Sequence, residues 1–243
     1  MGLNIKNEET HRLAVQLAAL TGETMTKAVQ PFPETDIYCI TAARFSLGRT
    51  NLDVVEQMLE ADVKIVQYRE KDFSMLEKYR ECLAIRQITA DHGATFIVND
   101  DVHLALAVEA DGVHVGQDDL PVEKVREIVG DRMLVGLSTH SPQQFDEAVR
   151  GGIADYVGVG PLYGTAIKKE PMAPVGLGYL DYVVQHYAIP FVAIGAIKEH
   201  NVGDVVRHGA RCVCLVSEIV GAEDIGAKIR AVRAKMNEWK VSS

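Results

Sequence analysis

Residues 95–116 read TFIVNDDVHLALAVEADGVHVG, and this stretch decides the fold class. It contains a short apolar run at 95–98, a helix-like segment at 101–110 and a second short run at 112–115. Runs of this length that are rich in Val and Ile are typical of strands buried on both faces of a parallel sheet. The stretch therefore predicts one strand–helix–strand unit.

The same alternation repeats from residue 36 to the end of the chain. Strands are predicted at 37–40, 63–66, 95–98, 112–115, 133–137, 155–159, 191–194 and 211–216. Helices are predicted at 51–61, 74–92, 101–110, 121–129, 142–151, 179–187, 199–208 and 223–239, with Asn51 and Ser74 as N-caps and Pro121 and Pro142 as first helical residues. Eight such units predict an α/β protein with a (β/α)8 TIM barrel. An open doubly wound sheet is the alternative, but it usually has fewer repeats.

The barrel accounts for residues 35–243 and leaves residues 1–34 as an N-terminal extension. This extension is predicted to hold a short helix around 8–20 and a Pro31-Phe32-Pro33 linker. Its apolar stretch at 13–20 is far shorter than the ~20 residues of a membrane span, and no signal-peptide pattern precedes it. We therefore expect a cytoplasmic protein that does not bind membranes.

The chain has 243 residues, of which 25 are basic and 34 acidic, so the formal net charge is −9. This balance argues against a nucleic-acid-binding surface, which needs clustered Lys and Arg. The four cysteines agree with a reducing compartment. Cys212 and Cys214 alternate along a predicted strand, where buried thiols are expected rather than a metal or redox pair.

Chemistry in such barrels lies at the C-terminal strand ends. Residues 63–71 read VKIVQYREK, and alternate positions share one face because strand side chains have a period of two. Gln67, Arg69 and Lys71 thus extend an inward-facing apolar row into a cationic barrel mouth. The alternative is a surface salt-bridge patch with Glu70 and Asp72.

Acidic pairs follow the next two strands, at Asp100-Asp101 and Asp118-Asp119. Adjacent loops can bring Asp100 and Asp119 within a few ångströms, where a divalent cation relieves their repulsion. Carboxylates completed by water and substrate phosphate suit Mg²⁺. The alternative is that these aspartates cap helices, as we expect for Asp101.

The remaining strand ends supply phosphate-binding candidates. They are Ser138 after the fifth strand, Thr165, Lys168 and Lys169 in a long connection after the sixth, Gly195-Ala196 after the seventh, and Val216-Ser217 after the eighth. The last two loops form the usual phosphate cradle of this fold. His114 lies within a strand and is expected to be packed. Two anion sites beside a metal indicate a metal-dependent transferase with a diphosphate leaving group.

These motifs resemble the thiamine phosphate synthase family over residues 36–238. The segments concerned are Gln67-Tyr68-Arg69-Glu70-Lys71, Asn99-Asp100-Asp101, Gly116-Gln117-Asp118-Asp119, Gly158-Val159-Gly160-Pro161 and Lys168-Lys169. The family joins a hydroxymethylpyrimidine diphosphate to a thiazole phosphate, which releases pyrophosphate and gives thiamine monophosphate. The expected partners are therefore these two small molecules, and a homodimer is a possible assembly.

The resemblance implies a role for each matching residue. The pyrimidine diphosphate would contact Gln67, Tyr68, Arg69, Glu70, Lys71, Asn99, Ser138 and Lys168, with Arg69, Lys71, Ser138 and Lys168 acting in catalysis. Asp100 and Asp119 would bind Mg²⁺. Thr165, Ile167, Gly195, Ala196, Val216 and Ser217 would surround the thiazole phosphate.

Two positions in the thiazole phosphate site depart from the family pattern. Ile167 replaces a usual Thr, and Ala196 replaces the second glycine of a usual Gly-Gly turn. The first strand also carries Thr41-Ala42 in place of Thr-Asp. Two alternatives stay open: a thiazole tautomerase of related fold, against which the retained Lys71, Asp100, Asp119 and Lys168 argue, and a non-catalytic ligand-binding barrel.

Overall fold

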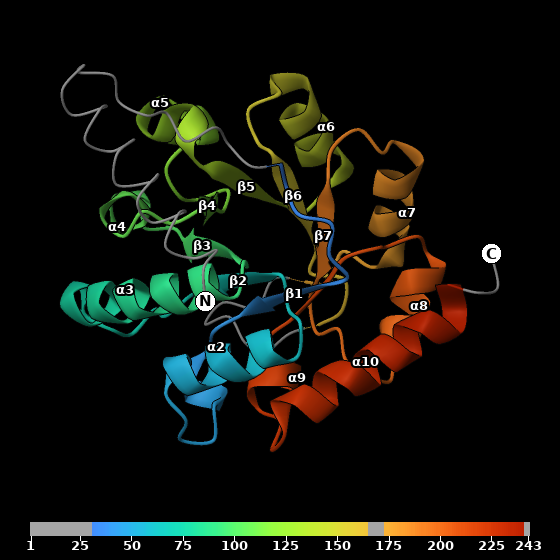
Figure 1. Ribbon diagram of the computed structural model, residues 1–243. Helices are drawn as coiled ribbons and strands as arrows, with labels where there is room; N and C mark the ends of the chain where they lie inside the picture. The colour runs from blue at the N-terminus through green and yellow to red at the C-terminus, as the bar shows by residue number, and fades with distance from the viewer. Residues whose placement is uncertain (1–30, 165–172, 241–243) are drawn as a thin grey trace, which may run out of the picture.

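Eight parallel strands close into a barrel, in which each strand pairs with the next along the chain and the last pairs with the first (Figure 1). The computed structural model describes residues 31–164 and 173–240. The strands are β1 (Ile37–Ile40), β2 (Ile65–Tyr68), β3 (Thr95–Asn99), β4 (Gly112–Val115), β5 (Leu134–Thr139), β6 (Tyr156–Val159), β7 (Phe191–Ile194) and β8 (Val213–Leu215). The predicted (β/α)8 barrel is confirmed, and its closure excludes the open doubly wound sheet.

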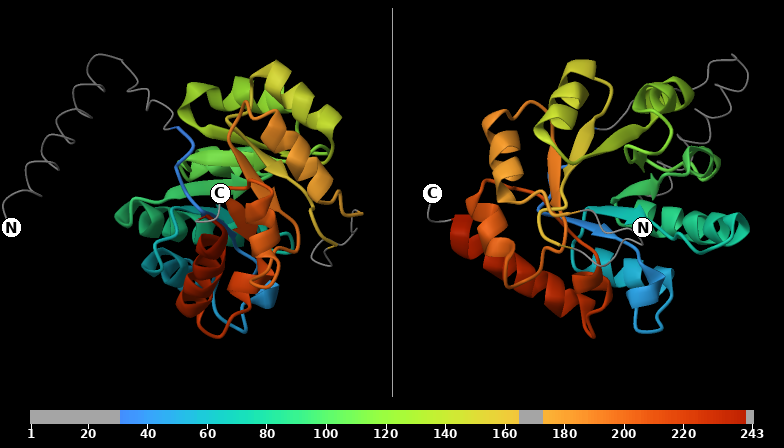
Figure 2. Two further views of the ribbon diagram at one scale, coloured as in Figure 1. Left: turned by 90° about the vertical axis from the view of Figure 1, so that its right-hand side faces the viewer. Right: turned by 180° about the vertical axis from the view of Figure 1, so that it is seen from behind.

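Helices surround the barrel on its outside, as the side and rear views show (Figure 2). They are α2 (Asn51–Glu60), α3 (Met75–Asp91), α4 (Val102–Ala107), α5 (Val122–Val129), α6 (Pro142–Gly151), α7 (Leu177–Gln185), α8 (Val202–Arg207), α9 (Ser217–Val220) and α10 (Ile225–Lys240). There are also two 3-10 turns: η1 (Ala43–Phe45) lies between β1 and α2, and η2 (Gly130–Arg132) lies between α5 and β5. The short α9 directly after β8 was not predicted. Within the described ranges, none of these helices is long and apolar enough to cross a membrane.

Local hydrogen bonds explain where the predicted boundaries were wrong. β2 starts at Ile65 rather than at Val63, because the Val63 N–H is used to close the end of α2, 3.1 Å from the Met58 carbonyl. The N-cap of α2 is Thr50 rather than Asn51. The Thr50 hydroxyl accepts from the backbone N–H of Asp53 at 3.1 Å, in a reciprocal capping box.

Two of the other three predicted helix starts are confirmed. Ser74 caps α3 in a second capping box, and Pro142 is the first residue of α6, as predicted. Pro121 stands one residue before α5 instead of opening it.

The barrel interior holds its own apolar cluster, separate from the layer between strands and helices. It consists of Tyr38, Ile40, Ile65, Ile97, Leu134, Tyr156, Val192, Cys212 and Cys214. These residues alternate along their strands with side chains that pack outward. Cys212 and Cys214 are buried free thiols, as predicted. Phe32, in the predicted linker, packs on Tyr156 with 4.6 Å between the ring centroids, so this partly buried residue covers the interior cluster.

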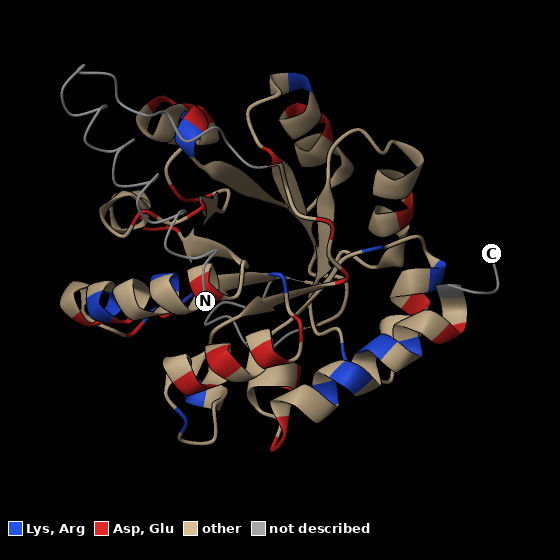
Figure 3. Ribbon diagram, viewed as in Figure 1, with Lys and Arg blue, Asp and Glu red and all other residues tan. Residues whose placement is uncertain are grey.

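Ion pairs between helices and the starts of strands hold the opposite end of the barrel. Arg86 lies 2.8 Å from Asp111, Arg126 lies 2.6 Å from Asp155, and Arg233 lies 3.0 Å from Asp36. The third pair joins α10, which carries a row of Lys and Arg, to the residue before β1 (Figure 3). With one end fixed in this way, the C-terminal strand ends are left for chemistry.

Candidate active site

Strand β2 leads polar side chains from the interior to the rim of the barrel. Gln67 is buried inside, where its Nε2 donates to the Tyr38 hydroxyl at 2.9 Å. The backbone N–H of Arg69 donates to the Thr41 hydroxyl at 2.9 Å, which fixes the chain as it leaves the strand. Lys71 reaches across to β3, where its Nζ lies 2.8 Å from Oδ2 of Asp100. The predicted row of alternate residues therefore leads from the interior to the rim.

The intervening residues of the same motif face elsewhere. Tyr68 is buried in the layer between strands and helices, and its hydroxyl donates to Glu81 of α3 at 2.7 Å. Glu70 accepts from the backbone N–H of Ala43 at 2.9 Å, and burial raises the pKa of its carboxyl. The expectation that both contact substrate does not fit these positions. Tyr68 braces a helix, and Glu70 positions the segment after β1.

Asp100 and Asp119 converge on the rim, as the acidic pairs predicted. Burial raises the pKa of Asp100, the Lys71 ammonium lowers it, and the neighbouring Asp119 carboxyl raises it again. Burial is the largest of these causes, so the net rise indicates a carboxyl largely shielded from water that lies against a second carboxyl. Asp119 is held by the backbone N–H of Gly116, 2.7 Å from its Oδ2. Asp100 has a left-handed backbone, with φ at +61°, which Asp tolerates better than most residues.

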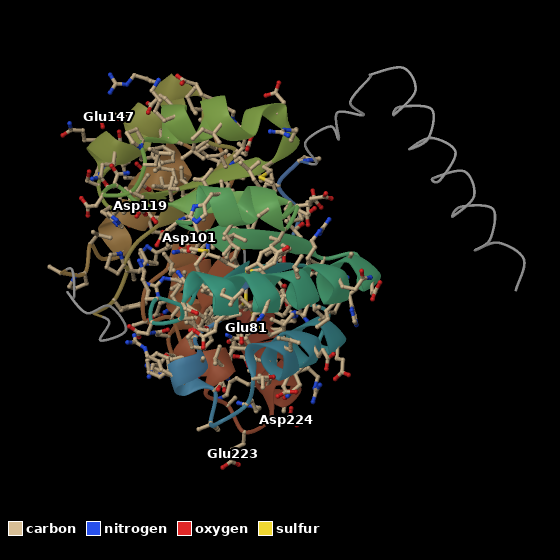
Figure 4. The ribbon with its side chains drawn as sticks, turned by 90° about the vertical axis from the view of Figure 1, so that its left-hand side faces the viewer. Glu81, Asp101, Asp119, Glu147, Glu223 and Asp224 are labelled. Atoms are coloured by element: carbon tan, nitrogen blue, oxygen red, sulfur yellow. The ribbon has the colours of Figure 1, made fainter. Side chains whose placement is uncertain are left out.

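Asp101, the sequence neighbour of Asp100, pairs with a different element. Asp101 occupies the N-cap position of α4, yet its side chain makes no capping bond and pairs instead with Lys78 at 2.9 Å. Figure 4 shows Asp101 and Asp119 on neighbouring segments of the molecule. The helix-cap alternative therefore fails for the Asp101 side chain, which is tied to α3.

Two carboxylates fit a hard cation that takes its other ligands from water and substrate. The contact between the Asp100 and Asp119 carboxyls is the observation that supports this fit. Among the described residues, no group of three or more Asp, Glu, His or Cys side chains gathers that could enclose a metal alone. Mg²⁺ is commonly held by one or two carboxylates with water and phosphate oxygens, so the arrangement suits it.

Strands β3 and β5 contribute the remaining polar side chains of this half of the mouth. Asn99 ends β3 two residues after Ile97, which belongs to the interior cluster, so Asn99 shares the inward-facing row. Ser138 of β5 lies 2.9 Å from Nε2 of His114. His114 is packed inside the barrel between Ser138 and Tyr156, as predicted.

The loops after β7 and β8 form the other half of the mouth. Gly195 has φ at +116°, and a Cβ there would lie 2.4 Å from Cα of Pro161, so only glycine fits. Ala196 also has a positive φ, at +46°, which is strained for a residue with a side chain. Ser217 begins α9, and Val216 packs against the interior cluster.

Several predicted residues lie outside the described ranges. They are Thr165, Ile167, Lys168 and Lys169, all in the connection between β6 and α7.

Comparison with known proteins agrees with this geometry. The family model described as thiamine monophosphate synthase matches residues 37–219, which include every strand of the barrel. The chain belongs to this family. A second family model, described as Rv0623-like transcription factor, matches residues 1–31.

Individual relatives support the same assignment. The thiamine-phosphate synthase of Pelotomaculum thermopropionicum is 60% identical over 201 residues, which cover 83% of this chain and 92% of the relative. That of Lawsonia intracellularis is 52% identical over 200 residues, covering 82% and 92%. A solved thiamine phosphate pyrophosphorylase from Pyrococcus furiosus superimposes with a TM-score of 0.76 at 32% identity, covering 85% of this chain and 97% of that one.

The activity follows from the family. The chain is a transferase of thiamine biosynthesis that joins a pyrimidine diphosphate to a thiazole phosphate and releases pyrophosphate. The chain retains the residues that the resemblance assigns to the pyrimidine diphosphate. Neither a thiazole tautomerase nor a non-catalytic barrel is needed to explain them.

Three side chains that contact the candidate residues or their neighbours were not predicted: Tyr38, Tyr156 and Glu81. Tyr38 and Tyr156 lie within apolar runs, so they were counted as core, and their hydroxyls meet only because the barrel closes. Glu81 lies on a helix, and nothing local shows that Tyr68 needs it. The one available signal was Gly136, a glycine within the strand predicted at 133–137, because glycine in a strand often marks a close approach by another group.

Proposed function

We propose that the chemical step is a dissociative loss of pyrophosphate at the rim formed by β2 to β5. Lys71, Asp100 and Asp119 support this proposal most directly, because they place a cation and two metal-ligating carboxylates together where the strands end. Breaking the C–O bond of the pyrimidine diphosphate builds negative charge on the leaving group. Fixed positive charge at that point stabilises the transition state.

Each side chain on this rim has a distinct task. Arg69 and Lys71 supply positive charge to the leaving diphosphate, and Ser138 donates a hydrogen bond to it. Gln67 and Asn99 contact the pyrimidine half, and Lys168 adds a charge from outside the described residues. Gln67 is buried and bonded to Tyr38 of the packed interior cluster, which closes this side of the mouth to bulk water.

Asp100 and Asp119 would hold Mg²⁺. The ion would neutralise charge on the departing phosphate oxygens. Both carboxylates are held by their own partners: the Gly116 N–H donates to Asp119, and Lys71 pairs with Asp100. The aminopyrimidine carries the positive charge left behind, and capture by the thiazole nitrogen requires no general base.

The loops after β7 and β8 would bind the thiazole phosphate. Gly195, Ala196, Val216 and Ser217 offer backbone N–H groups, and Thr165 and Ile167 complete the pocket from the connection after β6. The side-chain oxygen of Glu218, in α9, accepts from the Glu199 N–H at 3.4 Å, which links the two loops. We further propose a cytoplasmic location and a homodimeric assembly.

Replacing either rim carboxylate tests the metal site. Asp100→Asn and Asp119→Asn should each lower kcat by ~10²-fold, which corresponds to ~3 kcal/mol, and should raise the Mg²⁺ concentration needed for half-maximal rate. Asn keeps the size of Asp and also accepts a left-handed backbone, so folding should survive. Steady-state rates at varied Mg²⁺ measure both effects.

Asp101→Asn is the matched control, since Asp101 is the sequence neighbour of Asp100 but pairs with Lys78. It should change kcat by less than about threefold, because it removes only a partly exposed ion pair. Full activity of Asp100→Ala in metal-depleted buffer would contradict the proposed metal site.

Reverting the two departures tests the thiazole phosphate pocket. Ile167→Thr with Ala196→Gly should lower the KM for thiazole phosphate by about tenfold and leave kcat nearly unchanged. Thr restores a hydroxyl worth ~1.5–3 kcal/mol to a charged group, and Gly removes the strain of a positive φ. An unchanged KM would show that these positions do not line the pocket. A lower turnover would instead indicate a pocket reshaped for a modified thiazole.

We also propose that residues 1–31 are an accessory segment that catalysis does not require. Their match to a different family model supports this, since the synthase family match begins only at residue 37. Deleting residues 1–30 keeps Phe32, which packs on Tyr156, and should leave kcat and both KM values within about twofold. A tenfold loss of activity with unchanged thermal stability would contradict this separation.

A further inference from the structure

A chain of hydrogen bonds crosses the barrel interior and joins two proposed substrate contacts. Gln67 Nε2 lies 2.9 Å from the Tyr38 hydroxyl, which lies 2.9 Å from the Tyr156 hydroxyl. The Tyr156 hydroxyl lies 3.1 Å from Nδ1 of His114, and Nε2 of His114 lies 2.9 Å from Oγ of Ser138. The five side chains come from five strands, and the two tyrosines are 2% and 1% exposed. Gln67 and Ser138 are therefore connected through buried groups.

The strand sequences make room for this chain. A Cβ on Gly136 would lie 2.4 Å from Nδ1 of His114 and 2.3 Å from Cζ of Tyr156, closer than real Cβ contacts allow. Any larger residue there would separate the two rings. The glycine in the middle of β5 is thus explained by the meeting of His114 and Tyr156.

The chain has a direction, because each hydroxyl carries one hydrogen. Gln67 donates to Tyr38, so the Tyr38 hydrogen goes to Tyr156 and the Tyr156 hydrogen goes to Nδ1 of His114. His114 then carries its proton on Nε2 and donates to Oγ of Ser138. The hydrogen of Ser138 is left to donate to a ligand, and Oε1 of Gln67 is left to accept from one.

Burial determines the protonation state of the two tyrosines. Burial raises the pKa of Tyr38, donation to Tyr156 raises it further, and the bond received from Gln67 lowers it. Burial also raises the pKa of Tyr156, and the bond received from Tyr38 lowers it. Both hydroxyls are thereby kept protonated, as the chain requires.

The reverse direction would change both ends at once. Gln67 would then present its NH₂ group to a ligand, and Ser138 would spend its hydrogen on His114. A phosphate oxygen cannot donate to Ser138. In the reverse direction, therefore, neither end matches a ligand that carries an amine and a phosphate. Because the intermediate groups are shared, the two ends switch together or not at all.

We propose that Tyr38, Tyr156 and His114 are positioning residues that set Gln67 as an acceptor and Ser138 as a donor toward the same ligand. The matching ligand carries a ring amine at one end and an anionic phosphate oxygen at the other. This inference rests on the proposed function and adds to it a reason for preferring an amino group over a ring carbonyl oxygen. The three residues need not touch the reacting atoms.

Two tyrosine variants separate the links of the chain. Tyr156→Phe removes the hydrogen given to Nδ1 of His114, whereas Tyr38→Phe removes the bonds to Gln67 and Tyr156 and leaves the bond from Tyr156 to His114 in place. Tyr179→Phe is the matched control, because its buried hydroxyl donates to Thr139 at 2.7 Å outside the barrel interior. All three lose one buried tyrosine hydroxyl, so a general loss of stability would affect them alike.

The first readout is the tautomer of His114, from ¹⁵N NMR of the imidazole, with His114→Gln to assign the signal. The wild-type chain should show the Nε2–H form, as should Tyr38→Phe and Tyr179→Phe. Tyr156→Phe should show a mixture. A predominant Nδ1–H form in the wild type overturns the inference.

The second readout compares the pyrimidine diphosphate with an analogue that carries a carbonyl oxygen in place of the amine. The wild type should bind the amine form at least about tenfold more tightly, and Tyr38→Phe and Tyr156→Phe should lose most of that preference. Thiazole phosphate affinity should stay unchanged in all variants.

The two possible failures differ. Normal wild-type turnover with the preference intact in Tyr38→Phe and Tyr156→Phe overturns the inference alone. No wild-type turnover or binding of either substrate overturns the proposed function, and with it the ligand assigned to the chain.

Discussion

Closure of eight parallel strands is the constraint on which the rest of this structure depends. It places the C-terminal ends of all strands on one rim, and the period of two along each strand sends alternate side chains inward. Gln67, Asn99 and Ser138 therefore face a common space although 71 residues of sequence separate the first from the last (138 − 67). An open sheet with the same elements would leave β1 and β8 apart and would not bring Tyr38 to Tyr156.

The functional end of the barrel is built from conformations that are unfavourable in isolation. Asp100 and Ala196 both have positive φ, and Asp100 and Asp119 hold two carboxylates close together. Backbone strain and closely placed carboxylates of this kind cluster at functional sites, where the surrounding structure maintains them. Here the surrounding structure includes the Arg–Asp pairs at the opposite end, such as Arg126 with Asp155, which secure the strand starts.

The fold, and the positions of several residues of the candidate site, could be predicted from the sequence. The Val-rich runs recur at regular spacing, so strand positions were found within about two residues, and the acidic pairs after β3 and β4 located Asp100 and Asp119. Period-two counting also put Gln67 and Lys71 on the correct face. Tyr68 and Glu70 were included among the substrate contacts because they belong to the motif at 67–71. In the structure, Tyr68 donates to Glu81 of α3, and Glu70 accepts from the Ala43 N–H.

What the sequence could not show depends on contacts between distant strands. The bond from Tyr38 to Tyr156 spans 118 residues, and an apolar run gives no sign that a tyrosine within it is also a hydrogen-bond donor. The N-cap at Thr50 depends on a reciprocal bond with Asp53 that competed with an equally suitable Asn51. Asn51 is used elsewhere, since its side chain donates to Glu81 at 2.8 Å.

The central claim is that the diphosphate and a divalent cation share one site at the carboxylates of β3 and β4. Calorimetric titration of the pyrimidine diphosphate with and without Mg²⁺ tests it most directly, because two ligands that contact each other must strengthen each other's binding equally. The account predicts at least about tenfold tighter diphosphate binding with Mg²⁺, and a much smaller gain in Asp119→Asn. Equal affinities with and without Mg²⁺ in the wild-type chain would contradict it.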